Sequence, residues 1–308
     1  MDMSKNKIIV FGGTGYYGQQ IVRNLLQKGE SVRILSRDKA RAKKILGDEP
    51  DIIEGDITKR ESVIESLEGT KAVIISISAF HPKLIRKVQQ IERDAVLMIF
   101  KEAKNEGIDR VVYLSGYEMK EDVLRKLKLL RFGEIKLIIE RTLSSSEMNW
   151  TILGCAPSME LFFTFLKKDK MIVPGGGKCA VPTISARDVG EIAAQTVLRN
   201  DLKGKRIRLT GPEAFSFPEA AKRIAKVSGT PVRMINIPLV MIKTASIIAR
   251  PFNPFIRYVY WSLKLLNNFP QDLAEKVPIN HQLLLNTFDY IPTTFDVEIQ
   301  KRLMSHGG

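Results

Sequence analysis

A group of glycines near the amino end of the sequence could bind phosphate: Gly12, Gly13, Gly15 and Gly18. They lie between an apolar run, Ile8–Phe11, and an amphipathic run, Gln19–Gln27, so the pattern predicts a strand, a tight turn and a helix. Gly12 would permit the turn, Gly15 would let the backbone approach a pyrophosphate, and Gly18 would let the helix pack closely on the strand. The phosphates would then sit at the positive end of the helix dipole. We predict a dinucleotide site here; the alternative is a turn that only connects the two elements.

The residues after the second expected strand indicate which dinucleotide the site would take. That strand, Ser31–Ser36, leads into Arg37 and Asp38. NAD requires an acidic residue here for the ribose 2′-hydroxyl, whereas NADP requires a cation for the 2′-phosphate. Arg37 and Ser36 could hold that phosphate, and Asp38 is better explained as the N-cap of the next helix. The sequence therefore predicts NADP(H) in preference to NAD(H).

Short apolar segments alternate with helical ones through the first half of the chain. The expected strands are 8–11, 31–36, 52–54, 72–77, 110–115 and 150–153. Because helical segments separate them, the strands should be parallel, with helices on both faces. We predict an α/β fold, a Rossmann-type doubly wound parallel sheet, for residues 1–155. Residues 156–308 should form a smaller C-terminal α/β cap over a substrate pocket, with helices at 158–168, 186–198 and 216–227 and strands at 181–184, 206–209 and 232–235.

The composition is that of a globular protein, with 308 residues and 44% hydrophobic content. No uninterrupted apolar stretch reaches about 18 residues, and the first residues lack the apolar core of a signal peptide. A cytoplasmic protein is the expectation. Cys155 and Cys179 have no metal-ligand spacing and should be small buried or half-buried thiols rather than a redox pair. The scattered histidines suggest no metal site.

Several short motifs follow one another along the chain: Gly-Gly-Thr-Gly-x-x-Gly at 12–18, Ser36-Arg37, Glu54-Gly55-Asp56-Ile57, Val111–Ser115, Trp150–Leu153, Ile184–Val189 and Leu209–Glu213. Together they resemble the NmrA-like branch of the atypical short-chain dehydrogenase/reductases. The resemblance covers most of the chain to about Ile237. It implies NAD(P) binding by the glycine motif.

The resemblance also implies which side chains lie near the nucleotide. From the glycine motif and the second strand these are Gly12, Thr14, Gly15, Tyr16, Tyr17, Gly18, Ser36 and Arg37. After the third and fourth strands they are Asp56 and Ile57, toward the adenine, and Ile77, Ser78 and Ala79. From the residues alone, Asp56 is explained nearly as well as a helix cap or a turn residue.

The expected catalytic helix departs from the family pattern. Typical members carry Tyr-x-x-x-Lys there, in which tyrosine gives a proton to a carbonyl, while lysine holds the nicotinamide ribose and lowers the tyrosine pKa. The matching positions here are Phe132 and Lys136, so the lysine is present and the tyrosine is not. The resemblance implies that Ser115 is the active-site serine. Tyr117 could supply a second hydroxyl, although a packing role explains it better.

The departure is similar to that of isoflavone-reductase-like relatives, which also lack the tyrosine and use the lysine as acid and base. Lys136 could act in this way, as well as holding the nicotinamide ribose, if burial or a nearby cation lowers its pKa toward neutrality. The alternative is a lysine on the solvated face of the helix.

A segment without acidic residues carries much of the net charge of +14. Residues 220–271 contain no Asp or Glu, but they contain Lys222, Arg223, Lys226, Arg233, Lys243, Arg250, Arg257 and Lys264. The last four are spaced by seven residues, near one helix face, and two prolines divide the run into helices 239–249 and 255–266. An anionic membrane surface could bind the apolar and basic segment 239–266. A cap or dimer interface, or a protein partner, is the alternative; nucleic acid is disfavoured because no binding motif is present.

Two functions remain open from the sequence. One is an NADP(H)-dependent reductase that transfers hydride to a small molecule without the usual tyrosine. The other is a non-catalytic NADPH-binding redox sensor or accessory protein attached to a membrane or a complex, similar to the NADPH-binding accessory subunit of respiratory complex I. Phe132 favours the second, because loss of the acid matters little to a binding protein.

Overall fold

The computed structural model describes residues 6–118, 120–249 and 251–306. The chain forms two compact units. The first comprises Met1–Lys120, Gly133–Cys155 and Val189–Arg208, and the second comprises Glu121–Phe132, Ala156–Asp188 and Leu209–Gly308. Because each unit takes segments from several parts of the chain, the expected division into domains 1–155 and 156–308 stays a prediction.

The first unit is built on a seven-stranded sheet of order β10-β6-β5-β4-β1-β2-β3. Its strands are β1 (Lys7–Phe11), β2 (Ser31–Ser36), β3 (Asp51–Glu54), β4 (Thr70–Ile75), β5 (Arg110–Gly116), β6 (Asn149–Cys155) and β10 (Lys205–Leu209). The central strand β1 pairs in parallel with both β2 and β4, with Ile8 opposite Val32 and Ala72. The strand order reverses at β1, which is where ligands bind in open α/β sheets. The predicted Rossmann-type fold is confirmed.

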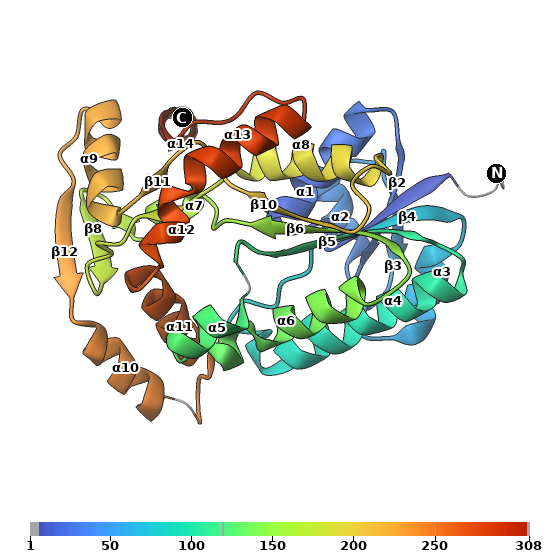
Figure 1. Cartoon of the computed structure of the whole chain (residues 1–308), viewed down its shortest axis with the longest axis horizontal. Coiled ribbons are helices and arrows are strands. Elements are labelled where there is room, and N and C mark those ends of the chain that lie inside the picture. Colours follow the sequence, from blue (N-terminus) through green and yellow to red (C-terminus); the bar gives the residue numbers. More distant parts are fainter. Residues whose placement is uncertain (1–5, 119, 250, 307–308) are drawn as a thin grey trace. The chain divides into compact units, whose positions relative to one another are not determined.

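Helices cover both faces of this sheet. They are α1 (Tyr16–Gln27), α2 (Lys39–Leu46), α3 (Arg60–Leu67), α4 (Ala95–Asn105), α6 (Leu130–Ser144) and α8 (Ala186–Val197). In Figure 1, α1, α2 and α8 lie on one face and α3, α4 and α6 on the other. Residues 8–11 of β1 are fully buried between the two layers, as a continuous apolar strand in a parallel sheet requires.

A short irregular stretch precedes α4. A 3₁₀ turn, η1 (Ile85–Lys87), is followed by a π-helix, η2 (Gln89–Asp94), that continues directly into α4. A π-helix is rare and is frequent at functional sites. Here it carries Glu92, whose contacts belong to the candidate site.

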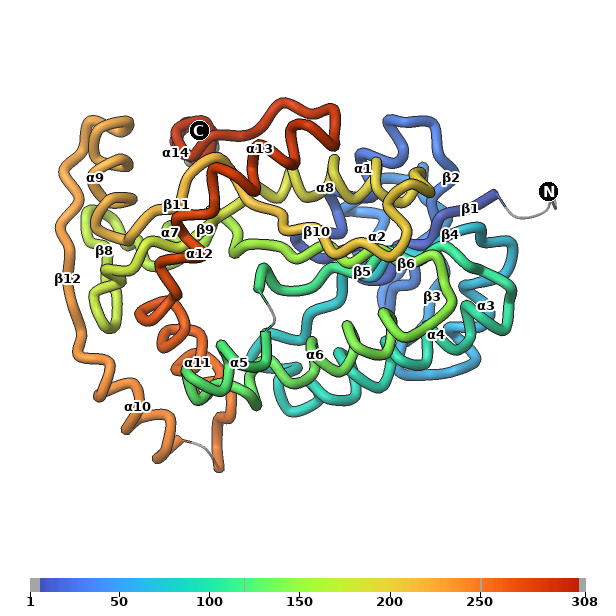
Figure 2. The backbone as a smooth tube through the Cα atoms, in the orientation of Figure 1, coloured from blue at the N-terminus to red at the C-terminus, as the bar shows by residue number. Residues whose placement is uncertain are grey.

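The second unit is a mixed α/β assembly. Its strands are β7 (Leu166–Lys167), β8 (Lys170–Pro174), β9 (Val181–Pro182), β11 (Ala214–Phe215) and β12 (Arg233–Ile237). Its helices are α5 (Glu121–Lys126), α7 (Glu160–Thr164), α9 (Phe217–Ser228), α10 (Leu239–Ile248), α11 (Phe255–Asn267), α12 (Gln271–Glu275), α13 (Val277–Thr287) and α14 (Phe295–His306). Figure 2 shows the chain passing from α9 through β12 into α10 and then α11.

Two sequence-based expectations for this part of the chain are corrected. The helix expected at 158–168 ends early, because α7 stops at Thr164 and residues 166–167 pair with β8 instead. The strand expected at 206–209 is β10, which belongs to the seven-stranded sheet rather than to a cap. Residues 166–167 fold back on β8 in a short hairpin, and β10 adds to the sheet edge beside β6; strand pairing, which periodicity does not specify, decides both.

A cluster of phenylalanine side chains forms the core of the second unit. Phe162 contacts Phe215, Phe217 and Phe295 with ring centroids 5.1–6.3 Å apart in edge-to-face arrangements. The buried carboxylate of Asp188 accepts hydrogen bonds from the N–H and hydroxyl of Thr293, at 2.8 and 2.6 Å. These contacts tie α14 and the segment before it to residues more than 100 positions earlier.

Of the helices in the described part of the chain, none combines the length and apolar character that crossing a membrane requires. The predicted helices 239–249 and 255–266 correspond to α10 and α11. Lys243 lies on α10, and Arg257 and Lys264 lie on α11. Arg250, the remaining member of the seven-residue series, lies outside the described residues.

Candidate nucleotide site and lysine centre

The glycine turn between β1 and α1 leaves no room for side chains at two positions. Gly12 has φ +83°, and a Cβ atom there would lie 2.2 Å from the carbonyl oxygen of Ser76. A Cβ atom on Gly18 would lie 2.0 Å from the carbonyl oxygen of Gly12. Gly15 is the N-cap of α1 and brings no capping side chain, and the first turn contains no acidic residue. This open, electropositive helix start fits a pyrophosphate.

Ser36, Arg37 and Asp38 at the end of β2 are arranged as the sequence predicts for a helix cap beside an exposed cation. Asp38 is the N-cap of α2, since its carboxylate accepts a hydrogen bond of 2.8 Å from the Arg41 N–H. The Ser36 hydroxyl donates to the Asp38 carbonyl oxygen at 3.0 Å. Arg37 is exposed directly between them. The prediction that Asp38 caps the helix is confirmed, and Arg37 is the cation at this strand end.

Asp56 has a local structural role. One of its carboxylate oxygens accepts hydrogen bonds of 2.9 Å from both the N–H and the hydroxyl of Thr58. Asp56 is thus a turn residue, which was one of the two interpretations from sequence. Its other oxygen takes no part in these two bonds, so the adenine contact stays a prediction, as does that of Ile57.

The segment after β4 is held by Glu92 of the π-helix. The Glu92 carboxylate accepts a hydrogen bond of 2.5 Å from the Ala79 N–H and one of 3.4 Å from the Ser78 hydroxyl. Ile77 and Ala79 are buried, whereas Ser78 is exposed. The sequence analysis missed Glu92, because no local pattern links a helix residue to a loop 13 positions earlier.

Lys136 lies in a cluster of ionisable side chains. Its ammonium is 5.1 Å from the centroid of the Tyr113 ring, a cation–π distance. The carboxylate charge of Glu92 also acts on it, and the buried thiol of Cys155 lies nearby. These groups come from β5, the π-helix and the end of β6, so tertiary structure assembles the centre. The alternative of a wholly solvated lysine does not hold, because Lys136 is half-buried.

The pKa of Lys136 moves in the direction opposite to the one required for a neutral base. Burial works to lower the pKa, but Tyr113 and Glu92 outweigh it, and the pKa is raised above the ordinary lysine value. Lys136 therefore stays an ammonium at neutral pH. It can hold an oxygen atom or give a proton, but it does not start as a free amine.

Two buried hydroxyls on β5 have no hydrogen-bond partner among the described residues. They are those of Tyr113 and Ser115, which are 1% and 6% exposed. Residues two apart on a strand lie on the same face, so both hydroxyls are on one side of β5. Burial raises the pKa of Tyr113, although Lys136 opposes the shift. The Tyr113 hydroxyl interacts with the Lys136 ammonium. The Ser115 hydroxyl is therefore the one for which a ligand would complete the bonding, since an unpaired buried hydroxyl is costly. Tyr113 could have been found from its two-residue spacing to Ser115.

The two other positions considered on sequence have packing roles. The Phe132 ring lies 6.5 Å from Tyr258 and 6.4 Å from Trp261 of α11. The family's tyrosine position is therefore filled by an aromatic contact. Tyr117 is 4% exposed, and its carbonyl oxygen accepts a hydrogen bond from Arg206. Neither residue supplies an exposed hydroxyl.

The thiol of Cys155 should be unreactive. Cys155 is buried and Cys179 half-buried, and both are free, as expected. Burial raises the pKa of Cys155 to about 12, although Lys136 and Arg206 oppose the shift. At pH 8 a thiol of this pKa is about 10⁻⁴ thiolate, the form that reacts. We expect iodoacetamide at pH 8 to alkylate Cys179 well before Cys155, as followed by mass spectrometry. In urea both should react; equal rates in the folded protein would contradict the prediction.

The family model decides what kind of chain this is. The model described as the NmrA-like family matches residues 4–298, almost the whole sequence. The chain belongs to the NmrA-like family. Its Rossmann-type fold is the NAD(P)-binding fold of that family, so the resemblance seen in the motifs is confirmed.

Relatives of this NmrA-like chain have different activities. It is 24% identical over 258 residues to photosystem II assembly factor Ycf39 of Synechocystis sp., covering 82% of this chain and 76% of that one. It is 26% identical over 243 residues to an NAD(P)H azoreductase of Xenophilus azovorans, covering 77% and 79%. The solved triphenylmethane reductase of Citrobacter sp., complexed with NADP(H), has the same fold, with a TM-score of 0.75 at 16% identity and coverage of 96% and 99%.

Proposed function

We propose that this NmrA-like protein binds NADP(H) and reduces a small organic molecule. The observation that carries the proposal is the glycine turn at the point where the strand order reverses, where Gly12 and Gly18 meet backbone oxygens too closely for any side chain. Such a turn places backbone N–H groups against a pyrophosphate. Thr14, Gly15, Tyr16 and Tyr17 would complete the phosphate contacts, and Ser36 and Arg37 would hold the 2′-phosphate.

The residues of the lysine centre have separate roles in this proposal. When bound, the dinucleotide would supply a hydride. The Lys136 ammonium would hold the nicotinamide ribose and stabilise negative charge that develops on the substrate. The Ser115 hydroxyl, which has no partner among the described residues, would donate to a substrate oxygen or nitrogen. Tyr113 and Glu92 would keep Lys136 charged and in place.

The absence of a tyrosine acid favours substrates that accept hydride without a strong proton donor. A positively charged triarylmethane carbon is such an acceptor, since hydride addition there gives a neutral product and consumes no proton. Azo and quinone groups spread the added charge over a conjugated system. The named relatives include an azoreductase and a triphenylmethane reductase. We therefore propose conjugated, electron-poor molecules as the substrate class.

Arg37 provides the test of cofactor choice. We expect Arg37→Ala to weaken NADPH binding about 10–100-fold, the loss typical of a charged hydrogen bond, and to leave NADH binding unchanged. Calorimetric titration of both nucleotides would measure this, after a check for nucleotide retained through purification. Lys44→Ala removes one exposed charge from α2 and serves as the control, with little expected change. Equal losses for NADPH and NADH would refute the assignment of Arg37.

A second candidate is an accessory protein that holds NADP(H) without turnover and attaches to another surface. The observation that favours it is the exposed apolar character of α10, where Ile247 and Ile248 are 65% and 69% exposed, and of Phe252, which is 83% exposed. Apolar side chains gathered in this way commonly mark an interaction site. A turnover measurement separates the two candidates, because the accessory role requires binding but no reduction.

A further inference from the structure

A basic cavity in the second unit has no role in the proposed reduction. It has a volume of about 570 Å³ and is lined by Arg125, Lys128, Leu129, Leu130, Arg131, Arg257 and Trp261. These residues come from α5, from the turn after it, from the start of α6 and from α11. The volume is within the range of small-molecule sites. None of the residues that line it is acidic.

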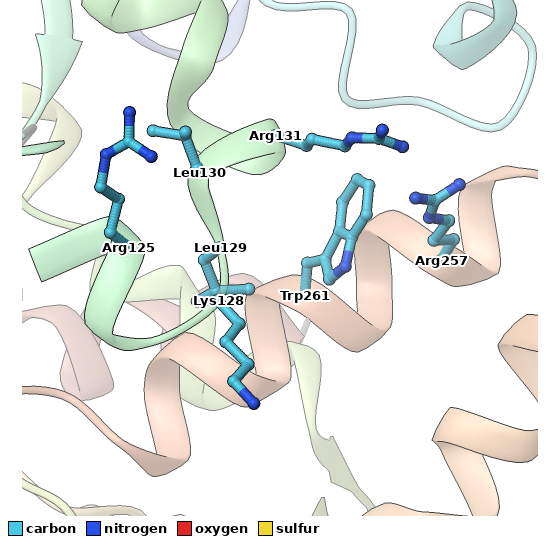
Figure 3. Close-up of a pocket in the computed structure, with 7 residues that line it drawn as sticks. All are labelled: Arg125, Lys128, Leu129, Leu130, Arg131, Arg257 and Trp261. Carbon is cyan, nitrogen blue, oxygen red and sulfur yellow. The ribbon is translucent and has the colours of Figure 1, made fainter.

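The arrangement around Trp261 concentrates positive charge. The Arg257 guanidinium lies 4.4 Å from the centroid of the Trp261 ring, a stacking contact that orients it. Phe132 packs against the same ring, which brings the neighbouring Arg131 beside α11. Figure 3 shows the guanidinium groups of Arg131 and Arg257 both reaching toward the indole of Trp261, whereas Lys128 extends away from it.

The wider sequence adds to this charge. The segment that contains Arg257 has no Asp or Glu over residues 220–271. Arg125 forms an ion pair with Glu121, one turn earlier on α5, so it lies at the edge of the cavity with part of its charge neutralised. Arg131 and Arg257 both reach toward Trp261, so they are the two cations best placed to act on one ligand.

We propose that this cavity binds a phosphoryl group, with Arg131 and Arg257 as its ligands and Trp261 as its wall. Guanidinium groups match phosphate oxygens in paired hydrogen bonds. The electrostatic attraction of two arginines and two outer cations is stronger for a doubly charged phosphate monoester or a diphosphate than for a singly charged carboxylate. The half-buried indole and the Leu129 and Leu130 side chains give the rest of the ligand an apolar contact. The proposal does not depend on hydride transfer.

A phosphoryl group could come from a soluble metabolite or from the head group of a membrane lipid. A lipid source is chemically reasonable because α11 follows α10 along the chain, and apolar side chains of α10 are exposed. Pyrophosphate represents the soluble source. Vesicles of phosphatidylcholine that contain phosphatidic acid, a phosphomonoester, represent the lipid source.

The fluorescence of Trp261 can report ligand binding in the cavity, because its indole lines the cavity. The chain has two tryptophans, so Trp150→Phe leaves Trp261 as the single emitter. We expect its fluorescence to change on titration with pyrophosphate or with the phosphatidic acid vesicles, in the presence of saturating NADPH. Arg131→Gln with Arg257→Gln in this background should raise the dissociation constant at least tenfold. NADPH affinity should stay within twofold of its starting value.

The matched control removes the same charge elsewhere. Lys222 and Lys226 belong to the same acid-free segment, but they line a different cavity together with Glu213 and Glu219. Lys222→Gln with Lys226→Gln should leave both titrations nearly unchanged. If the arginine double variant loses affinity for pyrophosphate alone, the ligand is a soluble phosphate. If it loses affinity for the vesicles, the ligand is a lipid head group. Equal losses in the two double variants, or no loss in the arginine variant, would overturn the proposal. Circular dichroism would confirm that each variant is folded.

Discussion

Gly12→Ala is expected to abolish NADPH binding and to destabilise the protein strongly. Two effects act together at this position. The left-handed backbone, φ +83°, costs an alanine about 1–2 kcal/mol, and the new Cβ would lie 2.2 Å from the Ser76 carbonyl oxygen, which adds about 1–3 kcal/mol of overpacking. Relief of that contact must move the turn or the end of β4, and both lie at the proposed site. Urea unfolding and calorimetric titration with NADPH measure the two losses.

Two other glycines separate strain from steric conflict. Gly29 has a similar φ, +77°, and nothing lies within 4 Å of the position of an added Cβ atom. Gly29→Ala should therefore lower the free energy of unfolding only by the cost of the left-handed backbone, and it should bind NADPH normally. Gly18 lacks the left-handed backbone, but its Cβ would lie 2.0 Å from the Gly12 carbonyl oxygen. Gly18→Ala should therefore show the conflict alone. If Gly12→Ala bound NADPH as tightly as Gly29→Ala, the glycine turn would not be the nucleotide site.

Lys136→Met should lower kcat about 10²–10⁴-fold, the usual contribution of a positioned proton donor. Methionine keeps much of the length of the side chain and removes the ammonium. The expected result is a large fall in kcat for an azo dye, whose reduction consumes protons, and a smaller change in NADPH affinity. The decrease in NADPH absorbance measures the turnover. Lys101→Ala, an exposed position on α4, is the control and should have no effect. A variant with unchanged kcat would exclude a catalytic role for Lys136.

The dependence of kcat on pH tests the protonation state of Lys136 independently. Because the pKa of Lys136 is raised, the ammonium persists through neutral and mildly alkaline pH, and the kcat that depends on it should stay flat there and fall only at high pH. Glu92→Gln removes one of the charges that raise this pKa, so the fall should move to lower pH. A kcat that instead rises with pH through the neutral range in the unaltered protein would mean that Lys136 acts as a neutral amine.

Turnover by the unaltered protein decides between the two proposed functions. Reduction of any conjugated acceptor that is lost in Lys136→Met supports the reductase. Tight NADPH binding with no reduction of azo, quinone or triarylmethane acceptors would support the accessory role instead. Phosphoryl binding at Arg131 and Arg257 is independent of either result.

The sequence was sufficient for six of the seven strands of the main sheet and for the glycine turn. Both are local: apolar strands between helical segments have one stable arrangement, and the glycines act on residues a few positions away. The N-cap at Asp38 was predictable for the same reason, because its hydrogen bond spans three residues. Family membership followed from motifs of this kind.

The environment of Lys136 and the placement of β10 depended on tertiary structure. A pKa reflects the charged and polar groups within a few ångströms, and the groups around Lys136 are Glu92, Tyr113 and Cys155, which are distant from it in sequence. The strand at 205–209 joined the main sheet because an unpaired edge of β6 was available to it. The basic cavity likewise joins Arg131 to Arg257 across more than 120 residues. Periodicity describes neighbours along the chain, whereas these properties depend on neighbours in space.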